Sequence, residues 1–253
     1  MPPRHLRPRA AALLAAAAVP LALAACSSGA TGATSATGTT SATGGPAPSA
    51  APPSAPAPAS PDANLLTGTQ LKGLLEPHSS FPPGFRSDPG GSRDTGPGYE
   101  VPSITQASRP KCRLLGGTSW ISITGINGVS FAQDDYIDKA SSAEIAQEID
   151  VYRGTASQDV LRKVARISAA CPWYTDAQTG SRATVREQAR PRLGDGGYVI
   201  TVTDPAWQNG TTLVAARVGT SVVTVLSTAG ADNGRASAVK LAAALTAELR
   251  GMA

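Results

Sequence analysis

The stretch LVAARVGTSVVTVLS, residues 213–227, decides the fold of this chain. Its two halves, residues 213–218 and 222–226, are rich in the apolar and β-branched side chains that favour strands. Gly219 and Thr220 between them fit a two-residue type II′ turn, in which glycine adopts the positive φ. The stretch therefore predicts a β-hairpin, a unit of antiparallel sheet.

More strands are expected before this hairpin. Apolar alternation or β-branched content predicts them at residues 119–126, 129–137, 144–152 and 198–202. Asn127 and Gly128 form a hairpin signal between the first two. For residues 144–152 the polar residues Glu144, Gln147 and Glu148 leave a helix as the alternative.

The clearest helix is predicted at residues 156–170. Thr155 and Gln158 form a capping box at its start, and Pro172 ends it. Apolar residues recur at helical spacing on one face, namely Val160, Leu161, Val164, Ile167 and Cys171. Cys171 is therefore expected to face the core at the end of this helix.

A second long helix is predicted near the end of the chain, with Asp232 or Asn233 at its N-cap and Gly251 after its last turn. Thr67 and Gln70 form the capping box of a shorter helix upstream. Amphipathic helices must bury their apolar faces on the sheet. The predicted fold is α+β, an antiparallel sheet of about five to six strands covered on one face by two long helices.

The start of the chain has the features of a targeting segment. Arg4, Arg7 and Arg9 precede 16 residues that are Ala, Leu and Val apart from Pro20. As a helix this run spans at most about 24 Å, whereas a membrane span needs roughly 20 residues. The segment is therefore typical of a secretory signal.

The end of this segment, Leu23-Ala24-Ala25-Cys26, resembles the lipobox of bacterial lipoproteins. The resemblance implies that residues 1–25 are removed as a signal peptide and that the Cys26 thiol receives a diacylglycerol with fatty acyl chains such as palmitate. Stable anchoring takes two or more chains, which this lipid supplies. We therefore expect a protein anchored to the cell membrane on its extracellular face. An ordinary secretory signal with a chance cysteine is the alternative.

Residues 26–63 are expected to be a disordered tether that begins with the lipidated cysteine. Every residue from Ser27 to Pro61 is Ala, Ser, Thr, Gly or Pro. Such side chains cannot build a core that offsets the backbone entropy lost on folding. The tether is expected to span roughly 30–35 Å and to hold a folded domain, residues 64–253, away from the membrane. O-glycosylation of its Ser and Thr is the alternative to an inert spacer.

The remaining cysteines and the net charge indicate a disulfide-bonded domain and argue against metal and nucleic-acid binding. Cys112 and Cys171 predict one disulfide in an exported domain, with two free thiols as the alternative. The domain has a single histidine and no CxxC motif, so neither a metal nor another cofactor is expected. Three of the 22 Lys and Arg lie in the signal and all 18 acidic residues follow it, so the mature chain carries 19 basic and 18 acidic side chains. A formal net charge of +1 is not the strongly basic balance that is typical of nucleic-acid-binding domains.

A diffuse resemblance covers about residues 64–250. Cys112 at its start, Cys171 at the end of the long helix, the run PRLGD at residues 191–195 and the stretch AARVGTSVVTVLS at residues 215–227 resemble the PknH-type extracellular sensor domain. That domain occurs at the end of some receptor kinases and in free-standing envelope lipoproteins. Its larger form has two disulfides, whereas this chain has cysteines for one. The resemblance implies a ligand-sensing or binding role at the cell surface.

The chain shows no catalytic motif. His78, the one imidazole outside the signal, lies in a Pro-rich loop, and no GxSxG motif is present. Asp134, Asp135 and Asp138 are carboxylates of the type that a glycosidase needs, with a solvated acidic loop as the alternative. LGDGG at residues 193–197 lacks the GK[ST] of a nucleotide-binding loop. We therefore expect that the protein is not an enzyme.

Basic and aromatic residues supply two further candidates. A run of arginines could meet an anionic envelope polymer or form a solvated strand face; its members are Arg182, Arg186, Arg190 and Arg192. Trp207 is expected to be a buried staple, with an exposed ligand platform as the alternative. Trp173 and Tyr174 are expected to pack in the core.

Three functions follow from these features, in decreasing order of support. The first is a non-enzymatic sensor or ligand-binding domain whose ligand lies on the uncovered side of the sheet, between loops at residues 78–102 and 204–210. The second is an interaction module that docks another cell-envelope protein. The third is an envelope hydrolase. The residues that contact the ligand are not predicted.

Overall fold

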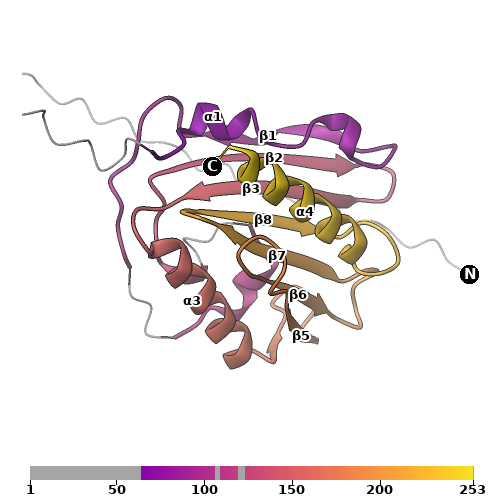
Figure 1. The fold of residues 1–253 in the computed structure, drawn as a ribbon. Helices are drawn as coiled ribbons and strands as arrows, with labels where there is room; N and C mark the ends of the chain where they lie inside the picture. Colours follow the sequence, from indigo (N-terminus) through magenta and orange to yellow (C-terminus); the bar gives the residue numbers. More distant parts are fainter. Residues whose placement is uncertain (1–63, 106–108, 119–122, 253) are drawn as a thin grey trace, which may run out of the picture. The chain divides into compact units, whose positions relative to one another are not determined.

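The protein was analysed as a computed structural model that describes residues 64–105, 109–118 and 123–252. Cys26 and the predicted signal and tether, residues 1–25 and 26–63, lie outside the described residues. The described part has an α+β fold built on one antiparallel sheet of eight strands (Figure 1). The predicted fold class is therefore confirmed.

The strands are β1 (Arg86–Asp94), β2 (Ser130–Asp138), β3 (Ala143–Val151), β4 (Trp173–Thr175), β5 (Arg182–Ala189), β6 (Gly197–Thr203), β7 (Thr211–Val218) and β8 (Ser221–Ser227). The helices are α1 (Gly68–Lys72), α3 (Ala156–Ala170) and α4 (Arg235–Gly251), and the 3-10 turns are η1 (His78–Ser80) and η2 (Cys112–Gly116). Across the sheet the strands run in the order β1-β2-β3-β8-β7-β6-β5-β4.

The hairpin predicted from residues 213–227 lies in the middle of this sheet. β7 and β8 pair from Thr212 with Ser227 to Val218 with Ser221, and Gly219 in the turn adopts a φ of 56°. The predicted strands at residues 129–137, 144–152 and 198–202 correspond to β2, β3 and β6, so the helical alternative at 144–152 is wrong.

The sheet has more strands than the five to six predicted. β1 forms within residues 78–102, which the sequence predicts to be a loop, and its register against β2 shifts between Asp88 and Arg93. Proline and glycine are tolerated there because β1 is an edge strand with an irregular register. β4 and β5 add the opposite edge. Of the predicted strand at residues 119–126, the described residues 123–126 contribute only an isolated bridge between Ile126 and Ile104.

The two long helices cover opposite faces of the sheet, which corrects the prediction that they share one face. On β7, Val214 packs in a cluster with α4, whereas Leu213 and Ala215 pack in a second cluster with α3. Successive residues of a strand point to opposite faces. The central strands are apolar on both faces, so each face needs its own helix, and Figure 1 shows α4 lying across the central strands.

The helix ends agree with the sequence in part. The predicted helix at 156–170 is α3, and both halves of the Thr67–Gln70 capping box are formed at α1. The capping box predicted at Thr155 is wrong, because its side chain makes no capping hydrogen bond. At α4 the N-cap is Gly234 rather than Asp232 or Asn233.

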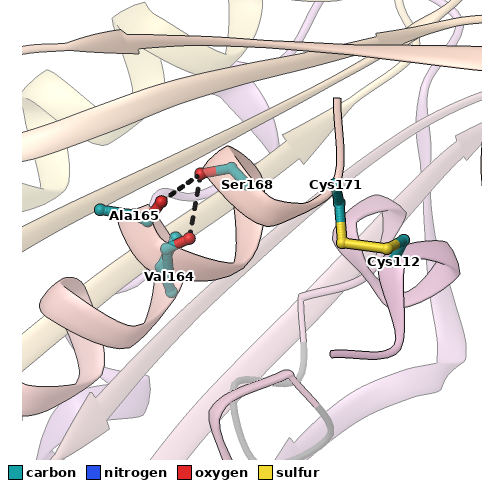
Figure 2. Close-up of a disulfide and its surroundings, with 5 residues drawn as sticks. All are labelled: Cys112, Val164, Ala165, Ser168 and Cys171. Carbon is teal, nitrogen blue, oxygen red and sulfur yellow. Dashed lines mark hydrogen bonds between the residues drawn. A yellow bond between two sulfur atoms is a disulfide. The ribbon is translucent and has the colours of Figure 1, made fainter. Parts of the chain in front are cut away.

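A disulfide joins η2 to the end of α3, as predicted. Cys112 and Cys171 are bonded with their Cα atoms 5.5 Å apart, and Cys171 is fully buried (Figure 2). In the last turn of α3 the hydroxyl of Ser168 donates hydrogen bonds to the carbonyls of Val164 and Ala165. The disulfide therefore fixes the segment that carries η2 against the α3 face of the sheet.

In the described part of the chain, no helix has the length and apolar character needed to cross a bilayer.

Candidate functional site

The catalytic candidates from the sequence have structural roles or are scattered. Nε2 of His78 lies 2.8 Å from the carbonyl oxygen of Phe85, and its ring stacks on Tyr136. Asp134 and Asp135 are neighbours on β2 and therefore point to opposite faces. Asp138 accepts hydrogen bonds from the backbone of Ala140 and the hydroxyl of Ser141, which lower the pKa of its carboxyl. Asp138 thus stabilises the β2–β3 turn.

The glycine-rich segment at residues 193–197 supports the central hairpin. Asp195 accepts a hydrogen bond from the backbone of Gly219 at 2.8 Å and lies 3.4 Å from Arg217 and 3.7 Å from Arg250. Gly194 adopts a φ of 59°, and a Cβ there would lie 2.2 Å from the carbonyl oxygen of Arg217. This tight turn therefore packs directly on β7.

The two loops predicted to frame a ligand site do not enclose one cleft. Residues 78–102 include η1 and the edge strand β1, whereas residues 204–210 connect β6 to β7. Four strands lie between β1 and β6 in the sheet. Trp207 in the second loop packs against the cluster on the α3 side, as predicted, but it is half-buried rather than buried.

An open surface lies where α4 stops covering the sheet. α4 packs on β7, β8 and β3, and the same face of β4, β5 and β6 continues beyond it. On β5, Ala183 and Val185 are buried on the α3 side, so the residues between them face the other way. We define the open shelf as the side chains on this face: Trp173, Arg182, Thr184, Arg186, Gln188, Thr201 and Thr203.

Trp173 is the aromatic residue of the shelf, and 49% of its surface is accessible. The prediction that it packs in the core is wrong, whereas Tyr174 does pack against the core cluster. The guanidinium carbon of Arg182 lies 4.4 Å from the centroid of the Trp173 ring. This distance is within the range of a cation–π contact.

The strand register places arginine and hydroxyl groups in rows across the shelf. Arg186 lies opposite Thr201, and the hydroxyl of Thr201 is 3.1 Å from that of Thr212 on β7. Thr184 lies opposite Thr203. Among the described residues, Arg182 and Arg186 form no ion pair.

The shelf is hollowed next to the start of α4. A cavity of about 710 Å³ is lined by strand residues that include Arg186, Thr201 and Thr203, and by Asn233 and Arg235 before and within α4. Arg235 donates a hydrogen bond to Gln188, and Asn233 accepts one from the backbone of Gly210 at 2.7 Å. This wall is therefore held in place by contacts to both neighbouring segments. Of the predicted arginine run, Arg182 and Arg186 lie on the shelf, whereas Arg190 and Arg192 follow β5.

A second unusual feature is a group of polar side chains buried on the α3 side of β3. Glu148 and Asp150 are 6% and 5% exposed, and Tyr152 and Thr224 are more deeply buried. Each of these four side chains has one buried polar atom without a hydrogen-bond partner. Burial raises the pKa of Glu148 to about 7 and raises the pKa of Asp150 well above its usual range. The pair holds a proton at pH values where exposed carboxyls are ionised.

The surroundings of this pair are partly charged. Arg93 on β1 donates a hydrogen bond to Gln133 on β2, and Gln133 donates one to Asp135 at 2.8 Å. Gln133 lies opposite Glu148 in the sheet, and Arg93 favours the ionised form of Glu148. In the described ranges no group of His, Cys, Asp and Glu is arranged to hold a metal ion.

Sequence reasoning missed both features, although period-2 alternation could have found them. Glu148 and Asp150 stand two positions apart in a predicted strand, which places them on one face. Trp173 and Tyr174 are adjacent in a strand, so only one of them can face the core.

Comparison with known proteins adds no family: no protein-family model matches the chain, and no curated protein matches it either.

Proposed function

We propose that this protein is a lipid-anchored domain on the extracellular face of the cell membrane that binds an envelope ligand without transforming it. The anchor is Cys26 and the tether is residues 26–63, on the sequence features described above. The ligand-binding surface is the open shelf. This proposal keeps the sensor-like role implied by the PknH-type resemblance and moves its ligand site from the two loops to the outer strands.

The observation that carries the proposal is the contact between Arg182 and an exposed Trp173 on an uncovered sheet face. Exposed tryptophan is uncommon outside interaction surfaces, because its large ring gains most from burial. Arg182 and Arg186 are exposed beside it, and no described carboxylate is within ion-pair distance of either. A surface with an aromatic ring and unpaired cations is suited to recognition rather than to stabilising the fold.

The test is retention of the purified full chain by cell-envelope material from which lipids have been extracted. The wild-type protein should sediment with this material, and Trp173→Ala should reduce the sedimented fraction at least fivefold. Gln178→Ala, at an exposed position after β4, is the control and should sediment like the wild type. Retention that is equal in wild type and Trp173→Ala would exclude the shelf as the ligand site.

The same experiment separates ligand binding from docking to another envelope protein. If protease treatment of the envelope material abolishes retention, the partner is a protein and the protein-docking function replaces the one proposed. If retention survives protease, a non-protein ligand is bound.

A further inference from the structure

We propose that the open shelf binds an acidic polysaccharide, a linear sugar chain that carries carboxylate or phosphate groups. This inference rests on the proposed function and names the class of ligand. Three properties of the shelf carry it: its charge, its polar lining and its shape.

The charge of the shelf and its wall is positive. Arg182 and Arg186 come from β5, and Arg235 comes from the wall at the start of α4. Two carboxylates also line the hollow. Asp232 accepts a hydrogen bond from the backbone of Ala236 at 2.8 Å, and Glu187 accepts one from the hydroxyl of Ser168 on α3. With the three arginines, these groups leave a formal net charge of +1. Arginine binds oxyanions through two parallel N–H groups, and among the described residues no carboxylate is paired with Arg182 or Arg186.

The spacing of the two strand arginines favours a chain over a small ion. Arg182 and Arg186 are four positions apart on β5, so their Cα atoms are separated by about 13 Å at the usual rise of a strand. This separation is larger than a small anion, so one such ion does not match the spacing of the two side chains. An extended polymer that runs along β5 can present a separate acidic group to each.

The remaining lining suits sugar rings. Between and beside the arginines stand hydroxyl and amide groups, from Thr184, Thr201, Thr203 and Gln188. These groups both donate and accept hydrogen bonds, as sugar hydroxyls do. Trp173 adds a half-exposed apolar ring, against which the apolar side of a sugar ring can pack.

The shape of the surface argues against the membrane as the occupant. Tryptophan and arginine also occur where proteins meet anionic lipid headgroups. Here, however, residues of β5 and β6 and residues at the start of α4 line an open hollow of about 710 Å³. A flat bilayer surface would leave this hollow unfilled, whereas a chain of sugars can enter it.

The closing experiment measures binding of the full chain to polygalacturonate, a carboxylated polysaccharide, with dextran of similar length as the neutral control. The double variant Arg182→Ala/Arg186→Ala removes two shelf charges. The matched control, Arg162→Ala/Arg166→Ala, removes two exposed arginines that are also four positions apart but lie on α3, on the opposite face. We expect the wild type to bind polygalacturonate and not dextran, the shelf variant to lose at least tenfold in affinity, and the α3 variant to lose less than twofold.

Three results would overturn the inference. Equal losses in the two double variants would mean that only the overall charge matters. Binding to phosphatidylglycerol vesicles that depends on Arg182 and Arg186 would identify lipid as the occupant. Failure to bind polygalacturonate or to be displaced by it from envelope material would exclude acidic polysaccharide, while the proposed function would survive if Trp173→Ala still reduced envelope retention.

Discussion

Glu148 and Asp150 place two carboxyl groups on the same buried face of β3, and each keeps one oxygen without a hydrogen-bond partner. Desolvation is the largest cause that raises the pKa of both carboxyls. The charge of Glu148 further raises the pKa of Asp150, whereas the hydrogen bond with Asp150 lowers the pKa of Glu148. The described groups that act on them include Arg93 on β1, Asp135 on β2 and Tyr152 just after β3. The pair therefore links the stability of the sheet to pH.

The first prediction is that stability falls as pH rises from about 4.5 to about 7. The pKa of Glu148 rises from its ordinary value of 4.5 to about 7 in the folded protein, so the folded state binds more protons within that window. The loss from this group is about 3 kcal/mol and is complete above pH 7. Urea unfolding of wild type and Glu148→Gln at pH 5 and pH 8 measures this loss. The variant should show a smaller difference between the two pH values, and the raised pKa of Asp150 accounts for the decline that remains.

Asp138→Asn is a control, because the contribution of Asp138 to stability changes with pH in the opposite direction to that of Glu148. Hydrogen bonds from Ser141 and Ala140 lower the pKa of Asp138, so its stabilising effect is present above its ordinary pKa and is lost in acid. This variant should leave the decline between pH 5 and pH 8 intact. A wild-type protein that is equally stable at pH 5 and pH 8 would contradict the prediction for Glu148.

The second prediction concerns the disulfide. Cys112 and Cys171 are 59 positions apart, and a cross-link that closes a loop of this length stabilises by about 4 kcal/mol in the chain-entropy model. The midpoint of urea unfolding should therefore shift to a lower urea concentration when reductant is added. The double variant Cys112→Ala/Cys171→Ala should be equally unstable with and without reductant. A wild-type midpoint that does not move after complete reduction would refute this account.

The third prediction uses two glycines that both adopt positive φ. Gly234 at the start of α4 has a φ of 80°, and a Cβ there would lie 1.9 Å from the carbonyl oxygen of Ser227. Gly154 has a φ of 56° with nothing within 4 Å of its Cβ position. Gly154→Ala should cost about 1–2 kcal/mol through backbone strain alone. Gly234→Ala should cost clearly more, because β8 and α4 must separate; equal losses in thermal unfolding would show that α4 adjusts freely.

The fold was predictable where local pattern and tertiary packing agree. The β7–β8 hairpin combines strand-forming residues with a turn glycine, and α3 combines an apolar stripe with a proline after its end. β1 was not predictable, because RSDPGGSRD opposes strand formation in every local respect. Pairing with β2 at a sheet edge overrides that propensity.

The side of the sheet that each helix covers depends on information beyond the helices. Both helices are amphipathic, and that property shows only that each has a face to bury. The discriminating signal lies in β7 and β8, where consecutive residues are buried without alternation. Such strands are covered on both faces. The open shelf follows from this arrangement, because one helix on each face cannot cover eight strands.

The fourth prediction tests the anchor on which the proposed location depends. Cys26→Ala removes the thiol that would receive the diacylglycerol, so the variant should be released from membranes or stay unprocessed with its signal attached. Ser27→Ala, at the next position, keeps the thiol and should be processed and fractionate like the wild type. Fractionation of cells, with mass measurement of the amino-terminal peptide, distinguishes these states. If Cys26→Ala were processed and bound to membranes like the wild type, the lipid anchor would be excluded.

Two or more acyl chains hold a protein stably at a bilayer, whereas one chain binds only marginally. A peptide that begins at Cys26 and carries a single acyl chain would therefore also contradict the proposed anchoring.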